Sequence, residues 1–381
     1  MPLNILHVVG ARPNFIKTAP IMRSLARADS VEQTLVHTGQ HYDDALSQHL
    51  FDDLDLPRPD LNLGVGSASH GIQTGRVMVA LEPVLERYEP DCLVLVGSAN
   101  STLAAALVAS KLGIRIALVE AGLRSRNWSM PEEINRVLTD RLSDALFTTE
   151  ASANENLRRE GIPEDRIHFV GNVMIDTLDR FRLRAADLHV HQQLGLEAGR
   201  YVLVTLHRPQ NVDDPVRLRA ILRSLPQIEY ECDGPVVFPL HPRTAGSVKR
   251  FGLDDELNGV RVLEPLRYLE FLSLMDSAGA VLTDSGGIQE ETTVLGVSCV
   301  TLRPETERPV TLTDGTNRLF DGNLNDLADV VREAFGEERR ASRPALWDGQ
   351  AAGRIAEAIL GQHATVSAEE QTESASTLGP S

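Results

Sequence analysis

The sequence predicts an α/β protein of two doubly wound domains, each built on a parallel sheet. Short apolar runs rich in β-branched residues alternate with longer patterns typical of helices, and this alternation weakens and restarts once along the 381 residues. Strands that alternate with helices form parallel sheets with right-handed crossovers. The near-continuous apolar character of the runs favours strands that are buried on both faces. At roughly 150 residues per domain, the length also fits two domains and a tail.

The first domain is predicted to span residues 1–180. Each of its strand-like runs is followed by a segment with a helical pattern or by a turn rich in Gly. The runs predicted as strands are Asn4–Val9, Thr34–His37, Cys92–Val96, Arg115–Val119, Ala145–Thr148 and Ile167–Val170. The segments predicted as helices are Ile16–Ala26, Ile72–Arg87, Ser101–Leu112 and Pro131–Leu142.

The second domain is predicted to span residues 198–345, after a polar helical stretch at Asp179–Gly199. Its predicted strands are Tyr201–Leu206, Val236–Leu240, Val260–Leu263, Ala278–Leu282 and Ser298–Leu302. A final helix within 346–362 is expected to pack across the junction of the domains. Residues 363–381 are small and polar and cannot bury enough apolar surface to order themselves, so we expect a disordered tail.

Composition narrows the possible partners and the compartment. The net charge of −17 argues against nucleic acid or an anionic membrane as partner, although local cations can still bind a small phosphate. The three cysteines are widely spaced and form no CxxC pair, which predicts neither disulfides nor a zinc site and fits a cytoplasmic protein. We find no signal-peptide pattern and no apolar stretch of about 18 residues that would span a membrane.

Ligands of open parallel sheets bind beyond the carboxyl ends of the strands, so the turns after the strands are the informative places. The first such turn is Gly10–Lys17, where a strand ends and a helix begins near Pro13. Arg12 and Lys17 would place two cations beside a helix N-terminus, an arrangement that favours phosphate. The alternative is an ordinary helix entry with solvated basic residues.

A second small, Gly-rich turn lies at Thr283–Glu291 and also precedes a helix. The hydroxyl of Ser285 and the amides of Gly286 and Gly287 could hold a diphosphate. One of the two following glutamates, Glu290 or Glu291, could accept hydrogen bonds from ribose hydroxyls. Capping of the helix by its own polar residues is the alternative, and it uses the same groups.

Carboxylates mark a third turn. Glu120 lies at the carboxyl end of a predicted strand, and Glu132 and Glu133 open the helix that follows. Two carboxylates at one sheet edge are a plausible acid/base or cation-stabilising pair. The alternative for Glu132 and Glu133 is a favourable interaction with the helix dipole.

Two strand ends of the second domain carry histidines. His207 and Arg208 follow the first strand, and His241 is followed by Pro242 and Arg243 after the next. A histidine can act as acid or base near neutral pH. A single histidine is more often structural, but two at neighbouring strand ends beside arginines favour a site.

Together these segments resemble the non-hydrolysing UDP-N-acetylglucosamine 2-epimerase family. The matching stretches run in family order from residue 3 to about 340. They are GARPNFIKTAPI (10–21), TGQHYDD (38–44), EAGLRS with MPEEINR (120–136), GNVMID (171–176), TLHRPQNVDD (205–214), FPLHPRT (238–244), TDSGGIQEE (283–291), TERPVT (306–311) and GTN (315–317). The resemblance implies a glycosyltransferase-B-like fold, in which two Rossmann-like domains face a cleft. It also implies a cytoplasmic homodimer that acts on a UDP-sugar and needs neither metal nor cofactor.

The resemblance also implies roles for individual residues. Those expected to take part in catalysis are Glu120, Glu132, His207, Lys17 and the residue at position 98, here Ser98. Those expected to contact UDP or the substrate are Arg12, Arg208, His241, Ser285, Gly286, Gly287 and Glu291. Gln40 and His241 match positions tied in some members to a regulatory UDP-sugar site.

The chain departs from the family pattern at strand ends of the predicted cleft. GDTNSTLA of the family reads GSANSTLA here, so an Asp and a Thr are replaced by Ser98 and Ala99. Leu118 stands where the family has a His, and Gln210 where it has a Glu. Three titratable groups are therefore missing, and loss of a positioned acid or base typically costs about 10²–10⁴-fold in rate.

Three functions therefore stay open. The first is an epimerase-like enzyme that interconverts UDP-GlcNAc and UDP-ManNAc, or relatives of them, through elimination and re-addition of UDP. The second is an enzyme that eliminates or hydrolyses a UDP-sugar, or that modifies an unusual sugar in secondary metabolism. The third is a catalytically silent UDP-sugar-binding protein. A glycosyltransferase of the same fold is a further alternative, which the HRPQN and EAGLR stretches disfavour.

Overall fold

The computed structural model describes residues 2–39 and 50–363. The chain divides into two compact units, unit 1 from Met1–Thr177 with Leu346–Ser381 and unit 2 from Leu178–Ala345. The first change of unit falls inside helix α7 (Val173–Ala186). Gln40 and the tail predicted to be disordered, apart from His363, lie outside the described residues. The cleft predicted between the domains stays a prediction.

Unit 1 is built on a seven-stranded sheet with the order β3-β2-β1-β4-β5-β6-β7, and the pairings are parallel. The strands are β1 (Leu3–Val9), β2 (Val31–His37), β3 (Leu61–Asn62), β4 (Cys92–Val96), β5 (Arg115–Ala121), β6 (Ala145–Thr148) and β7 (Ile167–Phe169). The predicted parallel α/β architecture is thus confirmed. Strand β3 was not predicted, because two residues carry no readable alternation.

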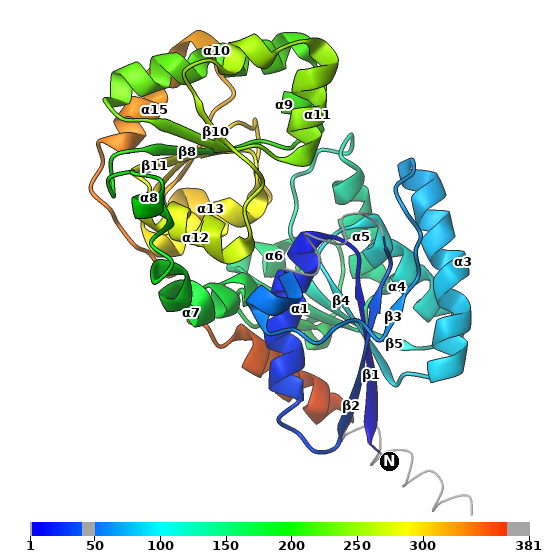
Figure 1. The fold of residues 1–381 in the computed structure, drawn as a ribbon. Helices are drawn as coiled ribbons and strands as arrows, with labels where there is room; N and C mark the ends of the chain where they lie inside the picture. Colours follow the sequence, from blue (N-terminus) through cyan, green and yellow to red (C-terminus); the bar gives the residue numbers. More distant parts are fainter. Residues whose placement is uncertain (1, 40–49, 364–381) are drawn as a thin grey trace, which may run out of the picture. The chain divides into compact units, whose positions relative to one another are not determined.

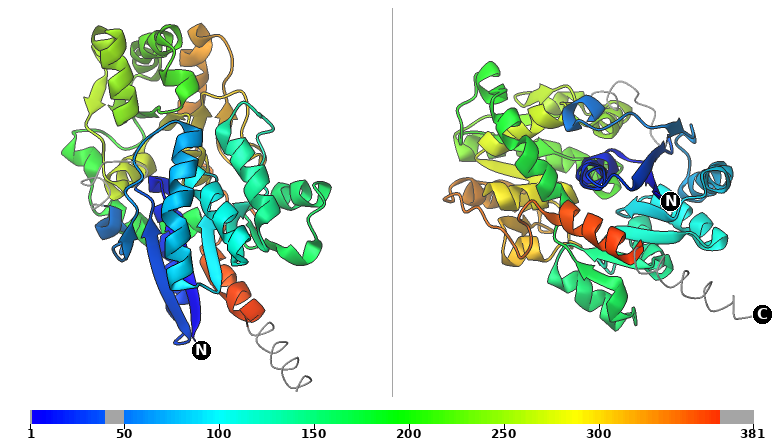
Figure 2. Two further views of the ribbon diagram at one scale, coloured as in Figure 1. Left: turned by 90° about the vertical axis from the view of Figure 1, so that its right-hand side faces the viewer. Right: turned by 90° about the horizontal axis from the view of Figure 1, so that it is seen from below.

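Helices cover both faces of this sheet (Figures 1 and 2). One face packs against α1 and the start of α7, and the other against α3, α4 and α6. Because both faces are covered, the side chains of β4 are apolar and buried throughout. The helices are α1 (Arg12–Leu25), α3 (His70–Tyr88), α4 (Asn100–Leu112), α5 (Pro131–Leu142), α6 (Ala151–Arg159) and the 3₁₀ turn η1 (Glu164–Arg166).

The last described helix, at 351–363, belongs to unit 1 although it follows unit 2 in the sequence. Its apolar side chains, among them Ala352, Ile355 and Ile359, are buried against the first sheet beside Ile5. The spacing of these three residues places them on one helical face. Trp347, just before the helix, is buried and its indole N–H donates to the carbonyl of Thr149.

Unit 2 is built on a six-stranded parallel sheet with the order β10-β9-β8-β11-β12-β13. Figure 1 shows α10 and α15 on one face of this sheet and α12 and α13 on the other. The short edge strand β13 was not predicted. The strands are β8 (Val202–Thr205), β9 (Val236–Pro239), β10 (Arg261–Leu263), β11 (Ala280–Thr283), β12 (Ser298–Thr301) and β13 (Asn317–Leu319).

The helices of unit 2 bury an aliphatic core against the sheet, dominated by Leu, Val and Ile as the low aromatic content requires. They are α8 (Val190–Gln193), α9 (Pro209–Val212), α10 (Pro215–Cys232), α11 (Pro242–Phe251), α12 (Tyr268–Ser277), α13 (Gly286–Leu295), α14 (Val310–Thr313) and α15 (Leu327–Phe335). The 3₁₀ turns are η2 (Asp254–Leu257) and η3 (Leu324–Asp326).

The three cysteines are free and buried. Burial raises the pKa of Cys92 to about 12 and those of Cys232 and Cys299 to about 11, so the thiols stay protonated near neutral pH. No helix in the described part of the chain is long and apolar enough to cross a membrane.

Candidate active site

The carboxyl edge of the first sheet is organised by Asn14, in the first turn of α1. Its side-chain oxygen accepts hydrogen bonds from the backbone N–H groups of Gly10 and Ala11, and its amide donates to the carbonyl of Val96 at 2.8 Å. One buried side chain therefore ties the turn after β1 to the end of β4. The amino end of α1, with the exposed Arg12, is held at this edge.

A buried ion pair lies at the same edge. Lys17 Nζ is 2.5 Å from Glu120 Oε2, and both side chains are more than 90% buried. Glu120 has a φ of +67° and lies where the register between β5 and β6 shifts. A non-Gly residue in this region is strained, and such strain concentrates at functional sites. A Cβ at Gly97 would lie 3.2 Å from Glu120 Oε2, so glycine makes room for the pair.

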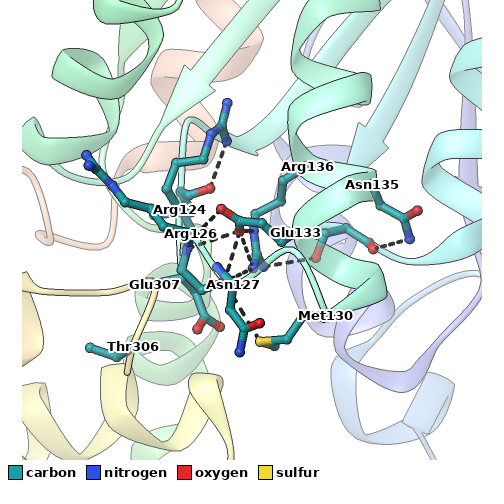
Figure 3. Close-up of polar contacts among 12 residues, drawn as sticks. Arg124, Arg126, Asn127, Met130, Glu133, Asn135, Arg136, Thr306 and Glu307 are labelled. Carbon is teal, nitrogen blue, oxygen red and sulfur yellow. Dashed lines mark hydrogen bonds and ion pairs between the residues drawn. The ribbon is translucent and has the colours of Figure 1, made fainter. Parts of the chain in front are cut away.

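Glu133, in the first turn of α5, holds the loop at 122–130 (Figure 3). Its carboxylate accepts hydrogen bonds from the backbone N–H groups of Ser125 and Arg126 and from the hydroxyl of Ser125, and it pairs with Arg136 at 2.8 Å. Burial alone would raise the pKa of Glu133, but these hydrogen bonds and the charge of Arg136 outweigh it and lower the pKa. Glu133 is therefore an ionised anchor of the loop.

Arg136 also faces the end of β4. Its Nη1 is 3.5 Å from Ser98 Oγ, and the neighbouring Asn135 donates to the carbonyl of Ser98 at 3.0 Å. Ser98 and Glu132 are both partly exposed. The structure thus brings Ser98 to the charged cluster of α5, whereas the carboxylate that binds the loop is Glu133 and not Glu132.

In unit 2, Asp284 at the end of β11 binds the predicted HRPQN turn at residues 207–211. Its fully buried carboxylate accepts from the backbone N–H groups of His207 and Arg208 and from the side-chain amide of Asn211. It also lies 3.1 Å from Nδ1 of His207. Asp284 is thus a hub that links two strand ends.

The contact with Asp284 affects the tautomer and the charge of His207. Because a carboxylate can only accept, a proton on Nδ1 would face Asp284 at this distance and leave Nε2 as the acceptor nitrogen. Removal from water lowers the pKa of His207, and the positive charges of Arg208 and Arg243 act in the same direction, against the carboxylate of Asp284. The imidazole is therefore neutral near pH 7, about one-third exposed, and suited to accept a proton at Nε2. Its ring centroid lies 5.4 Å from that of His241, the N-cap of α11.

The Ser285–Gly287 turn opens α13, as predicted. A Cβ at Gly286 would lie 2.6 Å from Arg308 Nη1, so an arginine packs directly against the helix N-terminus. Helix N-termini and arginines both favour phosphate oxygens. Glu291, one turn further on, is buried and accepts a hydrogen bond from the hydroxyl of Tyr268 at 2.9 Å.

A network of buried charges supports this turn. Arg308 pairs with Glu290 and with Glu307, and Glu307 pairs with Arg303 at 2.7 Å. Nη1 of Arg303 is buried and has no hydrogen-bond partner within the described ranges 2–39 and 50–363. Arg208 Nη2 lies 3.9 Å from Glu307. The network therefore surrounds the turn with guanidinium groups and leaves the buried Nη1 of Arg303 unsatisfied.

Several residues that build the site were not predicted. Asp284 was weighed only as a helix cap, although its place before Ser-Gly-Gly at a strand end was a signal of contact with the neighbouring turn. Arg136 and Arg308 lie inside the EEINR and TERPVT stretches without an assigned role. Asn14 had no signal beyond its place in the first turn of α1.

The comparisons with known proteins agree with this geometry. The family model described as UDP-N-acetylglucosamine 2-epimerase matches residues 23–360. This chain belongs to the UDP-N-acetylglucosamine 2-epimerase family. The family predicted from the motifs, and the two-domain α/β fold of its members, are thereby confirmed.

Relatives of this epimerase-family chain differ in the sugar they are named for. The UDP-N-acetylglucosamine 2-epimerase of Methanocaldococcus jannaschii is 42% identical over 354 residues, which cover 91% of this chain and 96% of that protein. The UDP-2,3-diacetamido-2,3-dideoxy-D-glucuronate 2-epimerase of Pseudomonas aeruginosa is 41% identical, over 93% of this chain and 99% of that protein. The crystal structure of the M. jannaschii enzyme in complex with UDP-GlcNAc and UDP matches with a TM-score of 0.87 at 40% identity, covering 94% of this chain and 99% of that one.

Among the residues that the structure describes, no three His, Cys, Asp or Glu side chains are grouped so that they could hold a metal ion.

Proposed function

We propose that this chain is a 2-epimerase of UDP-amino sugars that interconverts UDP-GlcNAc and UDP-ManNAc, or close relatives of them, by eliminating and re-adding UDP. The observation that carries the proposal is the buried Lys17–Glu120 pair at the carboxyl edge of the first sheet, in a chain of the epimerase family. A strained carboxylate next to a lysine, where ligands of parallel sheets bind, is what a reaction with charged intermediates needs.

The chemistry follows from the carbon that is inverted. C2 of the sugar lies next to no carbonyl, so its proton is not acidic. If the C1–O bond to UDP breaks, its electron pair leaves with UDP, and C1 gains oxocarbenium character. A base then takes the C2 proton, which leaves a glycal. Return of a proton to the other face of C2 and attack of UDP on C1 complete the inversion.

Unit 2 is suited to hold the leaving diphosphate. The Ser285, Gly286 and Gly287 turn at the N-terminus of α13 offers backbone donors, and Arg308 packs against it. The unsatisfied Nη1 of Arg303 supplies a further donor that an anion would satisfy. Stabilising the departing charge with fixed donors is typically the largest catalytic contribution.

Further residues take the roles that family membership suggests. Arg12 and Arg208 contact the UDP moiety, and Glu291 and His241 lie on its nucleoside side. His241 with Gln40 would also form the regulatory UDP-sugar site.

We assign the proton transfers to groups at these sheet edges. Glu120 and Glu132 serve as the base for C2 and as the stabiliser of positive charge at C1, and Lys17 pairs with Glu120. His207, neutral with a free Nε2, takes or returns a proton at the leaving oxygen. Ser98 contributes a hydroxyl only, because serine has no useful basicity near pH 7.

The assembly and compartment that we propose are a homodimer in the cytoplasm. The exposed apolar side chains of Ile134 and Leu138, one turn apart on α5, and the exposed Trp128 support a contact with a second copy. Mass measured by light scattering tests it, and a monomer at micromolar concentration would reject it.

A second function rests on Ser98. Because the carboxylate at this position is missing, the chain could release UDP and stop at the glycal or at a hydrolysed sugar. A chain that binds UDP-sugars without any turnover is the third possibility. The second function differs from epimerisation in lacking the return of a proton to C2, whereas the third includes no chemical step.

Deuterium from the solvent distinguishes the three. We expect incubation of the full chain with UDP-GlcNAc in D₂O to place deuterium at C2 of both UDP-GlcNAc and UDP-ManNAc, read by NMR and mass spectrometry. Release of UDP with a glycal or free sugar, and without UDP-ManNAc, would instead identify the second function. Saturable binding of UDP with no change in any sugar would identify the third.

A further inference from the structure

The side chain of Gln289 joins three segments of unit 2. Gln289 lies on α13, one turn after Ser285, and is fully buried. Its amide nitrogen donates to the carbonyl of Ser285 at 3.2 Å. Its amide oxygen accepts from the hydroxyl of Thr306 at 2.7 Å and from the side-chain amide of Asn317, on β13, at 3.1 Å. One neutral side chain therefore ties the turn at the start of α13 to the loop before α14 and to an edge strand of the sheet.

The hydroxyl groups next to Gln289 hold the backbone of Arg308. Thr306 accepts from the backbone N–H of Arg308 at 3.1 Å, while its own proton goes to Gln289. On the other side, Thr311 donates to the carbonyl of Arg308 at 2.8 Å and accepts from Asn317 at 3.1 Å. Both backbone polar groups of Arg308 are therefore connected to Gln289, each through a threonine hydroxyl.

The directions of these hydrogen bonds are mutually consistent. Thr301, on β12, donates to the side-chain oxygen of Asn317 at 2.6 Å. The amide nitrogen of Asn317 has two hydrogens, and they point to Gln289 and Thr311. A threonine hydroxyl has a single proton, and each threonine of the network gives it to one acceptor. Buried networks in which donors and acceptors match in this way make their surroundings rigid and specify one arrangement of their members.

The place of Arg308 matters because its guanidinium packs against the N-terminus of α13, where a Cβ at Gly286 would lie 2.6 Å from Nη1. Glu307 pairs with this guanidinium but lies on the same loop and would move with it. The ion pair with Glu290 at 2.6 Å and the hydrogen bonds of Gln289 join the loop to the helix. Donors stabilise an anion most when they are fixed in advance, and a helix N-terminus beside a guanidinium favours phosphate oxygens. Gln289 can therefore affect an anion at this turn without contacting it.

We propose that Gln289 is a positioning residue of the diphosphate site, which sets the place of Arg308 relative to the N-terminus of α13. The inference rests on the proposed function, because it assumes that the diphosphate of UDP lies at the Ser285–Gly287 turn. Gln289 touches no substrate in this assignment and acts through Arg308. Its effect on binding is therefore confined to ligands that carry phosphate.

The test compares UDP with uridine, which has the same nucleoside and lacks the diphosphate. Binding to the full chain is measured by calorimetry for UDP and by competition with UDP for uridine. Gln289→Met removes the amide from a side chain of similar length, and Thr306→Val removes one hydroxyl with little change of size. We expect both variants to bind UDP about tenfold more weakly, the loss of roughly one charge-assisted hydrogen bond, and to bind uridine within about threefold of the wild type.

Two further variants distinguish positioning from a general contribution to stability. Thr306→Ser keeps the hydroxyl and is expected to restore UDP binding to within about threefold of the wild type. Thr292→Val removes a buried hydroxyl of the same helix that donates to the carbonyl of Ile288, and it should leave the binding of both ligands unchanged. Thermal unfolding verifies that each variant is folded, and the partly exposed Thr306 decides the outcome if the change at Gln289 prevents folding.

Equal weakening of UDP and uridine binding would overturn the inference, and so would unchanged UDP binding in Thr306→Val or a loss of the same size in Thr292→Val. A wild type that does not bind UDP would reject the proposed function together with the inference. Deuterium exchange at C2 by the wild type separates the two. Exchange combined with unchanged UDP binding in the variants retains the epimerase and rejects the role of Gln289, whereas the expected binding pattern without exchange retains that role and rejects the epimerase.

Discussion

The two units have similar sheet edges, but the charged side chains at these edges are paired differently. At the edge of unit 1 a strained Glu120 meets Lys17, and Ser98 leaves part of Arg136 without a carboxylate. At the edge of unit 2, Asp284 accepts from the backbone N–H groups of His207 and Arg208 and from the side-chain amide of Asn211, and Arg308 pairs with Glu307 beside the turn before α13. The donors of unit 2 are thus held by buried carboxylates, whereas unit 1 carries the groups to which we assign the proton transfers at the sugar.

The largest effect is expected when the hub of unit 2 is changed. Asp284→Asn presents an amide N–H to Nδ1 of His207 and favours the wrong tautomer, so we expect kcat for epimerisation to fall about 10²–10⁴-fold. The kinetics are measured with UDP-GlcNAc, and thermal unfolding verifies that the fold is retained. Asp321→Asn, an exposed change in the same unit, is the control.

A double variant tests whether the effect of Asp284 depends on His207. If Asp284 acts through His207, then Asp284→Asn combined with His207→Asn loses no more activity than His207→Asn alone. Additive losses would show that Asp284 only stabilises the loop, and the contrast between the units would then be one of stability alone.

The buried ion pair of unit 1 is expected to be more sensitive to loss of a charge than an exposed pair of the same unit. Lys17→Met leaves Glu120 buried without its partner and is expected to lower the free energy of unfolding by about 3–5 kcal/mol, measured by urea denaturation. Adding Glu120→Gln should recover most of the loss. Arg158→Met breaks the exposed pair with Glu164 and should change the unfolding free energy little. Equal losses in both single variants would contradict the distinction between buried and exposed pairs.

The first sheet should also be sensitive to acid. Burial of His7 within β1 lowers its pKa from the ordinary value of 6.5 to about 4. Below pH 6.5 the unfolded chain binds a proton that the folded chain does not bind, so stability falls between pH 6.5 and 4, by at most about 3 kcal/mol.

His7→Gln should remove this slope. The difference in unfolding free energy between wild type and His7→Gln is therefore expected to change in favour of the variant as the pH falls from about 7 to about 4.5. A parallel pH dependence of wild type and His7→Gln would show that His7 is protonated in the folded protein.

The smallest effect concerns the preorganised turn of unit 2. An added Cβ in Gly286→Ala would lie 2.6 Å from Arg308 and 3.0 Å from Glu307, which forces the guanidinium away. We expect UDP to bind about tenfold more weakly by calorimetry, the loss of roughly one charge-assisted hydrogen bond. Gly246→Ala, on α11 with open space around its Cβ, is the matched control. Unchanged UDP binding in Gly286→Ala would remove this turn from the proposed diphosphate site.

Sequence patterns located most elements because local chemistry decides them. Cys92–Val96, Ala145–Thr148 and Pro131–Leu142 have the predicted bounds, since an apolar β-branched run or a proline at the first helical turn needs no distant partner. The short edge strands β3 and β13 were missed, because two or three residues become strands only through the neighbour they pair with.

For the candidate site too, local sequence predicts some features and distant partners decide the others. Sequence by itself determined the family, the strand-end turns and the residues available there, since motifs and strand–turn–helix order are local properties. Only the tertiary structure decided that Lys17 pairs with Glu120, that Glu133 and not Glu132 anchors the loop, and that Asp284 holds His207. These pairs lie far apart in the chain or compete with equivalent neighbours, so their partners depend on how the strands order themselves in the sheet.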